Sequence, residues 1–388
     1  MPPVAAFMLL FAVLYAAFGV ASPFMPALME SRGLTPEQIG LLFGCATAAR
    51  LVSAPLAGRF ADAITALRLT LAMFCVGTAL TTLGYLAASG FWPLFGVGLL
   101  HAVALAPTTN VADAIAVSAA RRHGFEYGWV RGSASAAFIA ASIAAGAAVV
   151  AFGLPVIVML QAGLMMTVPL FLRAVPAAPS ESAKQDIDRE SVRLLLRSPV
   201  FRRVVLAAAL ILGSHALHDT FSVIRWTNAG ISPQTASLLW SLAVAGEVFV
   251  FFLAGPWVLR RISPSMAVAV AAIVAAFRWL VSASTVDIAA LTLIQPLHGV
   301  TFALLHLACM RLLGEHVPPR LAATAQAIYG TLGIGAVTAA LTIASGWLYG
   351  RLGPMAFVVM AVISMTAMPV ALSMRSILRH SVLSPALR

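Results

Sequence analysis

Residues 4–28 read VAAFMLLFAVLYAAFGVASPFMPAL and contain no charged side chain. At about 1.5 Å of rise per helical residue, the stretch is long enough to cross a hydrocarbon layer about 30 Å thick. It is longer than the apolar core of a signal peptide, and no basic segment precedes it. We therefore expect it to be retained as a membrane-spanning helix.

The rest of the chain repeats this pattern. Of its 388 residues, 61% are hydrophobic and 10% are charged, and the mean hydropathy is +0.97. These values lie outside the range of soluble globular proteins. We predict an all-α membrane protein with about twelve transmembrane helices. The predicted helices are 4–28, 39–57, 69–88, 93–118, 129–152, 154–172, 204–226, 234–254, 265–284, 288–310, 323–347 and 355–373.

The positive charge is distributed as in a membrane protein. A net charge of +11 would suggest nucleic-acid binding in a soluble protein, but here the basic residues border apolar helices and form no single patch, so we expect no nucleic acid as a partner. With both termini in the cytoplasm, only Arg32, Arg225 and Arg351 lie on the outer side. We expect a multi-pass protein of a bacterial cell inner membrane with both termini cytoplasmic.

A polar stretch near the middle of the chain suggests two halves. We predict an N-terminal six-helix bundle at 1–172, a cytoplasmic linker at 173–203 and a C-terminal six-helix bundle at 204–388. The sequence Gly33-Leu-Thr-Pro recurs as Gly230-Ile-Ser-Pro, at an offset of 197 residues, and the same offset maps Gly58 onto Gly255. We expect each of these last two glycines to end a helix. One offset that links both ends of a helix favours a parallel duplication.

The sequence argues against enzymatic and metal chemistry. Cys45, Cys75 and Cys309 are far apart in apolar segments, so neither a disulfide framework nor a metal cluster is indicated. There is no Walker-type ATP-binding loop and no nucleophile, base and acid constellation. We expect no enzyme activity, no cofactor and no metal.

Two groups of motifs carry a family resemblance. The segment from Gly58 to Asp62, together with Arg68, resembles the signature loop of the major facilitator superfamily, although Ala63, Thr65 and Ala66 depart from the family pattern. The following strings resemble the phenylpropionate permease branch of that superfamily, near the lactose permease and nucleoside permease types: Asn110-Val-Ala-Asp113, Glu126-Tyr127-Gly128-Trp-Val-Arg131, Gly213-Ser-His215-Ala-Leu-His218-Asp219, Phe277-Arg278-Trp279 and Leu297-His298-Gly-Val-Thr301-Phe302.

This resemblance covers nearly the whole chain and implies the major facilitator fold, with two pseudo-symmetric six-helix bundles. By similarity to the lactose permease type, Asp113 and Arg131 match two residues that hold substrate. Glu247, Arg278 and His298 match members of its C-terminal polar network. Thr301 stands where that permease has its principal proton-carrying glutamate, and His215 and His218 replace two aspartates. Proton coupling would therefore follow a different route here.

Charged side chains within predicted helices are energetically costly, so they usually face the bundle interior and mark a transport path. This chain has Arg50, Arg131, Arg278, Asp113, Asp219 and Glu247 in such positions. His215 and Asp219 are four residues apart and share a helix face. We predict substrate binding by Arg131, Asp113, Glu247, Asn110, Tyr15, Tyr329 and Trp240; proton coupling by Glu247, His298, His215, Asp219 and Arg278; and gating by Asp62, Arg68 and Arg50.

The leading hypothesis is proton-coupled symport of a small organic acid, in particular an aromatic one, by alternating access. Arg131 is the first choice to clamp the substrate carboxylate. Alternatives remain open: a proton-coupled sugar or nucleoside permease, a drug or metabolite exporter, or a membrane scaffold without transport. The expected partners are a small-molecule substrate, protons and the lipid bilayer, and we expect a monomer.

Overall fold

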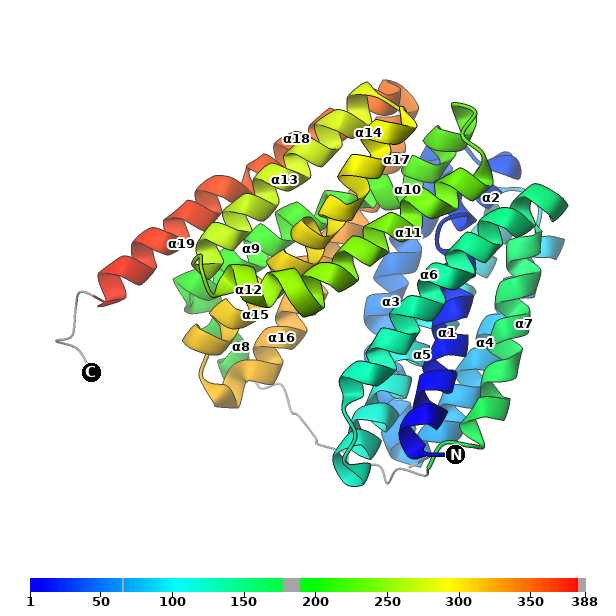
Figure 1. Ribbon diagram of the computed structural model, residues 1–388, viewed down its shortest axis with the longest axis horizontal. Coiled ribbons are helices and arrows are strands. Elements are labelled where there is room, and N and C mark those ends of the chain that lie inside the picture. Colours follow the sequence, from blue (N-terminus) through cyan, green and yellow to red (C-terminus); the bar gives the residue numbers. More distant parts are fainter. Residues whose placement is uncertain (65, 177–188, 383–388) are drawn as a thin grey trace. The chain divides into compact units, whose positions relative to one another are not determined.

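The structure is a computed structural model that describes residues 1–64, 66–176 and 189–382. Within these ranges every regular element is helical and none is a strand (Figure 1). The all-α prediction is therefore confirmed. The contacts divide the chain into two compact units.

Unit 1 consists of Met1–Lys184 together with Thr220–Ser241. Its first segment contains α1 (Pro3–Ala21), α2 (Met25–Ser31), α3 (Pro36–Ile64), α4 (Leu67–Ala87), α5 (Phe91–His123), α6 (Tyr127–Phe152) and α7 (Val156–Leu172). Helix α1 packs along α6 and α7, α4 packs on α5 and α7, and α3 packs on α5. The dark blue α1 can be followed beside α6 in Figure 1.

Unit 2 consists of Gln185–Asp219 and Leu242–Arg388, so that α10 and α11 contribute residues to both units. The elements from here on are α8 (Arg189–Arg197), α9 (Pro199–Gly213), α10 (His215–Asn228), α11 (Pro233–Phe249), η1 (Val250–Ala254), α12 (Gly255–Leu259), α13 (Pro264–Ser284), α14 (Ile288–Ile294), η2 (Gln295–Leu297), η3 (Val300–Leu304), α15 (Leu305–His316), η4 (Pro319–Leu321), α16 (Ala322–Ile328), η5 (Tyr329–Ala336), α17 (Val337–Leu352), η6 (Gly353–Met355), α18 (Ala356–Met365) and α19 (Ala367–Val382).

The two units share one internal packing pattern. In unit 1, α1 contacts α5, α6 and α7. In unit 2, α9 contacts α15 in the place of α5, η5 and α17 in the place of α6, and α18 and α19 in the place of α7. Likewise α4 contacts α5 and α7, while α13 contacts α15, α18 and α19. Helices in corresponding places of the chain therefore have corresponding neighbours, as a parallel duplication requires.

The repeated sequence motif forms the same turn twice. Gly33 and Gly230 have φ angles of 83° and 88°, a backbone conformation that glycine adopts without strain. Two residues later, the hydroxyl of Thr35 or Ser232 accepts a hydrogen bond from a backbone N–H in the first turn of the next helix, at 3.4 and 3.2 Å. This is N-capping, and it places the starts of α3 and α11 at Pro36 and Pro233.

The prediction that Gly58 and Gly255 end their helices is wrong. Helix α3 continues to Ile64, and the chain after Gly255 stays helical to Leu259. After Gly58 the helix continues past the charged Arg59, whereas after Gly255 the apolar run itself continues to Leu259. A glycine inside a helix does not end it as long as the backbone hydrogen bonds are maintained.

Among the described residues, ten helices are long and apolar enough to cross a membrane. One of these stretches, Thr324–Met374, has 51 residues, about 76 Å of helix and more than twice the hydrocarbon thickness. It turns at η6, where Gly353 has a φ angle of 53°, so it supplies two crossings. The apolar helix α7, with 17 residues, supplies another. The predicted count of twelve fits this arrangement.

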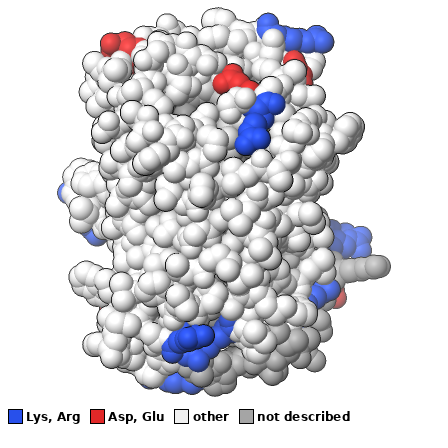
Figure 2. Space-filling view, turned by 90° about the vertical axis from the view of Figure 1, so that its right-hand side faces the viewer, with Lys and Arg blue, Asp and Glu red and all other residues white. Residues whose placement is uncertain are grey.

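The molecular surface agrees with a membrane environment. On the face shown in Figure 2, charged side chains lie near the top, near the bottom and at the side edges, and the broad middle of the face is white. Large apolar side chains are exposed, among them Trp92 at 74% and Phe152 at 76%. Exposed apolar side chains on this scale indicate contact with lipid.

Candidate functional site

Unit 1 contains a polar cluster made by α1, α5 and α6, called here the unit 1 cluster: Tyr15, Asp113, Tyr127 and Arg131. Arg131 Nη1 lies 3.6 Å from Asp113 Oδ1, and it also donates a hydrogen bond to the Tyr15 hydroxyl. The Tyr127 hydroxyl donates to Asp113 Oδ1 at 2.5 Å. The Arg131 and Asp113 side chains are 40% and 37% exposed. The charge of Arg131 is thus balanced within its own unit.

Close packing of α1 on α6 brings these groups together. A Cβ atom on Gly19 would lie 2.4 Å from the carbonyl oxygen of Phe138, so only glycine permits this approach. Just beyond it, Ser142 Oγ donates to the Gly19 carbonyl at 2.8 Å. One turn earlier on α1, Tyr15 places its ring 5.0 Å from the guanidinium carbon of Arg131. The pair therefore gains a cation–π contact.

Unit 2 contains a larger cluster, called the unit 2 cluster: His215, His218, Asp219, Glu247, Arg278, His298 and Thr301. At its centre Arg278, only 1% exposed, donates to Thr301 Oγ1 at 2.9 Å. His215 Nε2 lies 2.9 Å from the same hydroxyl and 3.2 Å from Arg278 Nη1. Thr301 therefore joins the arginine and the histidine.

The hydrogen bonds of His215 assign its protonation. Its Nδ1 lies 2.9 Å from the carbonyl oxygen of Ile211, which can only accept, so Nδ1 carries the proton. The Nε2 atom faces a guanidinium donor of Arg278 and must therefore accept. This arrangement holds His215 in the neutral form, with Arg278 as the cation.

The unit 2 cluster contains two acid–histidine pairs, Glu247 with His298 and Asp219 with His218. Glu247 Oε2 lies 3.7 Å from His298 Nε2, and the two side chains are 28% and 16% exposed. The ring of His298 lies 5.2 Å from that of His215, and its Nδ1 atom is buried without a hydrogen-bond partner. His218 Nδ1 lies 3.2 Å from Asp219 Oδ1, and Asp219 is 55% exposed.

Two glycines allow Glu247 and His298 to meet. A Cβ on Gly246 would lie 2.3 Å from the carbonyl oxygen of Pro296, and a Cβ on Gly299 would lie 2.2 Å from the carbonyl oxygen of Gly246. The two backbones therefore touch directly beside the acid and the histidine. The π-helical segments η1 and η3 follow at once, and such wide turns are frequent at functional sites.

Gly299→Ala is expected to destabilise the protein by about 1–3 kcal/mol, because the added methyl group must displace backbone. Gly314→Ala is the matched control, since a Cβ there meets nothing within 4 Å. The melting temperature of the purified protein in detergent measures both. Equal melting temperatures for the two variants would show that the backbones do not touch at Gly299.

The remaining residues predicted to bind substrate have different surroundings. Asn110 is exposed on α5, one turn before Asp113, so both side chains lie on the same face. Trp240 is partly buried on α11. Tyr329 is 2% exposed in the hydrophobic core of unit 2, with its ring 6.0 Å from that of His306. Tyr329 therefore packs as a core residue, and we leave it out of the proposed substrate contacts.

Of the residues predicted to gate, the structure describes the side chains of Arg50 and Arg68. Asp62 falls on α3, but its side chain lies outside the described residues. Arg68 is partly buried at the start of α4, with its Nε atom lacking a hydrogen-bond partner. Arg50 is exposed at the middle of α3.

Sequence reasoning missed two residues that complete these clusters, Tyr127 and Trp279. Tyr127 binds Asp113, and a signal was present, because it lies one helical turn before Arg131. Trp279 donates from its indole nitrogen to Ser214 Oγ at 2.9 Å, and its ring centroid lies 4.7 Å from the guanidinium carbon of Arg278.

Over the part of the chain that the structure describes, no group of three His, Cys, Asp or Glu residues could hold a metal ion.

Known proteins resemble this chain along most of its length. The sequence model of the MFS_1 like family matches residues 5–360. The chain is 32% identical over 364 residues to the probable 3-phenylpropionic acid transporter of Escherichia coli (strain K12), covering 91% of this chain and 93% of that protein. It is 24% identical over 354 residues to the maltose permease of Geobacillus stearothermophilus, covering 89% and 87%.

Solved structures share the fold at lower identity. The nucleoside transporter NupG superposes with a TM-score of 0.82 at 17% identity, covering 97% of this chain and 99% of that one. A bacterial homologue of the human lysosomal transporter Spinster, solved in an inward-facing and unoccupied conformation, gives a TM-score of 0.76 at 16% identity, with 97% of each chain covered.

Proposed function

Because the chain belongs to the major facilitator superfamily of membrane transporters, we propose that it carries a small organic acid across the membrane together with protons. Membership confirms the family resemblance seen in the sequence, and it makes the chain a multi-pass secondary transporter and not an enzyme. Proton coupling and the substrate class are the parts of the proposal that need experiment.

The substrate class is supported by the relative at 32% identity. That protein is described as a probable transporter of 3-phenylpropionic acid, an aryl carboxylate. Arginines at membrane depth fit an anionic substrate, because each supplies two parallel N–H donors to a carboxylate. The maltose permease at 24% identity favours a sugar as the second candidate, with the accessible carboxylate of Asp113 as a hydroxyl acceptor.

The proton site is best supported by one observation: Glu247 Oε2 lies 3.7 Å from His298 Nε2, and both side chains are partly exposed. A carboxylate takes a proton from water and becomes neutral, and a neighbouring imidazole can accept that proton or return it. His215 is held neutral by Ile211 and Arg278. The proposal therefore places the transported proton on Glu247 and His298, with His215 and Arg278 as fixed neighbours.

Transport would follow alternating access by the two six-helix bundles, 1–172 and 204–388, joined by the linker 173–203. The shared packing pattern of the two units supports this division. The excess of Lys and Arg in the loops on one side supports an inner membrane location with both termini cytoplasmic.

The test is uptake into proteoliposomes with an alkaline interior. Labelled 3-phenylpropionate is expected to accumulate, and its addition should raise the external pH as protons enter with it. Accumulation of maltose or uridine instead would assign the chain to the sugar or nucleoside class. Accumulation without any pH change would contradict proton symport of that substrate.

A further inference from the structure

Helix α3 carries a positive charge at the middle of its length. Fourteen residues separate Arg50 from Pro36, and the same number separates it from Ile64. Arg50 therefore lies roughly 21 Å along the helix axis from each end of α3. Its side chain is exposed in the structure.

This arginine differs from the other two arginines at membrane depth. Arg131 is paired with Asp113, and Arg278 is held by Thr301 and His215 with the charge of Asp219 acting on it. The ion pairs found among the described side chains do not include Arg50. An uncompensated charge at this depth is costly, so it indicates a role that needs an anion from outside the chain.

The neighbours of Arg50 supply no acid. Its charge acts on Tyr85 and His101, which are only 3% and 6% exposed. Their rings lie 5.6 Å apart, and His101 Nδ1 lies 3.2 Å from Thr82 Oγ1. Neither side chain carries a carboxylate, so neither forms an ion pair with Arg50.

The internal repeat gives this site a counterpart. The offset of 197 residues, which the turns at Gly33 and Gly230 establish, maps Arg50 onto Glu247 and His101 onto His298. At these equivalent positions, unit 2 has a glutamate beside a histidine, and unit 1 has an arginine near a histidine. An acid binds a proton, whereas a permanent cation binds an anion, so the two copies suit the two species of a proton and acid symport.

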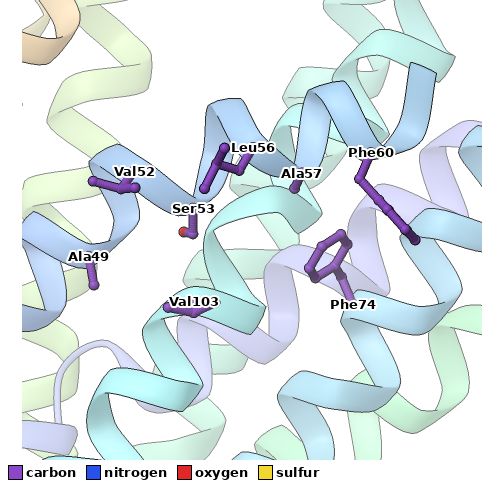
Figure 3. Close-up of a pocket in the computed structure, with 8 residues that line it drawn as sticks. All are labelled: Ala49, Val52, Ser53, Leu56, Ala57, Phe60, Phe74 and Val103. Carbon is purple, nitrogen blue, oxygen red and sulfur yellow. The ribbon is translucent and has the colours of Figure 1, made fainter. Parts of the chain in front are cut away.

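An open apolar hollow of about 480 Å³ lies along α3, and residues on either side of Arg50 in the sequence line it, although Arg50 itself is not among them. Ala49 and Ser53, the residues just before and one turn after Arg50, line it together with Val103 of α5 and Phe74 of α4, whose ring points towards α3 in Figure 3. Apart from Ser53, the lining residues are apolar. A cation beside an apolar hollow is suited to a molecule with one carboxylate and one hydrophobic group.

A lipid headgroup does not fit this position. Headgroup phosphates lie outside a hydrocarbon core about 30 Å thick, near the ends of membrane helices. Arg50 lies eight residues before Gly58, where the apolar run of α3 ends, which is roughly 12 Å from that end of the run. The anion favoured at this depth is a small molecule.

We propose that Arg50 binds the carboxylate of the substrate, with the hydrophobic part of the substrate beside the α3 cavity, and that Arg131 remains paired with Asp113. The inference rests on the proposed function in one respect, that the substrate is an organic acid. It replaces Arg131 as the carboxylate clamp and gives Arg50 a binding role in place of gating.

The test measures equilibrium binding of two ligands of the same shape to purified protein: 3-phenylpropionate, which carries the charge, and 3-phenyl-1-propanol, which does not. Arg50→Gln is expected to weaken binding of the carboxylate by about 100-fold, the value of losing charge-assisted hydrogen bonds, with binding of the alcohol unchanged. Arg50→Lys keeps the charge but loses the planar fork, and should weaken carboxylate binding by about tenfold. Arg122→Gln, an exposed arginine on α5, is the matched control and should bind both ligands as the wild type does.

The outcomes separate this inference from the proposed function. If the wild type binds 3-phenylpropionate and Arg50→Gln binds it equally well, the carboxylate is held elsewhere and the inference is overturned while the proposed function stands. If the wild type binds no small carboxylate, both are overturned. Should Arg50→Gln fail to fold, as loss of alcohol binding would show, Arg50→Lys decides: wild-type affinity for the carboxylate there overturns the inference, and selective loss supports it.

Discussion

Glu247→Gln is expected to abolish accumulation of substrate against its gradient while leaving exchange of substrate across the membrane intact. Glutamine has the shape and neutral charge of a protonated glutamate but can neither release nor take up a proton. A carrier locked in this form can reorient with substrate bound, which allows exchange, but it carries no proton, so a pH gradient cannot drive net uptake. Uptake driven by a pH gradient should therefore fall to the level reached without a gradient.

The measurement compares two assays on the same proteoliposomes. Uptake of labelled 3-phenylpropionate under an imposed pH gradient reports coupling, and counterflow from vesicles preloaded with unlabelled substrate reports exchange. Glu315→Gln is the matched control, because Glu315 is 45% exposed and lies 2.8 Å from Arg311 at the end of α15. An exposed pair of this kind contributes little, so both assays should match the wild type.

Gradient-driven accumulation by Glu247→Gln would show that the transported proton binds elsewhere. His298 is then the next group to test, because it is the partner of Glu247 at 3.7 Å. Loss of both accumulation and counterflow would instead make Glu247 a substrate-binding residue, as the sequence also predicts.

The sequence predicted the helices well because lipid imposes a simple rule: each crossing needs an uninterrupted apolar run. It predicted the ends poorly. Helix α5 continues to His123 and α15 to His316, past the apolar runs that mark them. Beyond the membrane the chain meets water, where polar side chains continue a helix without any hydrophobic signal.

The candidate site was partly predictable for a similar reason. An ionised group inside a membrane helix needs a polar environment, so Asp113, Arg131, Glu247 and Arg278 could be identified from their positions alone. Their partners could not, because pairing depends on how helices rotate against each other. Nothing in the sequence indicated that Arg131 already has a carboxylate partner while Arg50 has none among the described residues.

Asp219→Asn is expected to destabilise unit 2, because the charge of Arg278 would lose the carboxylate that acts on it. The described ion pairs do not include Asp219 with Arg278, and water screens an exposed carboxylate, so we expect a loss of about 1 kcal/mol or less. Asp219 is 55% exposed, whereas Arg278 is 1% exposed and cannot move its charge to water. The free energy of unfolding, or the melting temperature in detergent, measures the effect.

The double variant Asp219→Asn with Arg278→Gln isolates the interaction, because it removes both charges together. If the two charges stabilise each other, the double variant is more stable than the sum of the two single changes allows. Asp287→Asn is the control: Asp287 caps α14 by accepting from the Ala290 N–H at 3.0 Å, and asparagine caps a helix equally well. Strict additivity in the cycle would mean that Arg278 is stabilised by Thr301 and His215 alone, and that Asp219 is available to bind a proton or substrate independently.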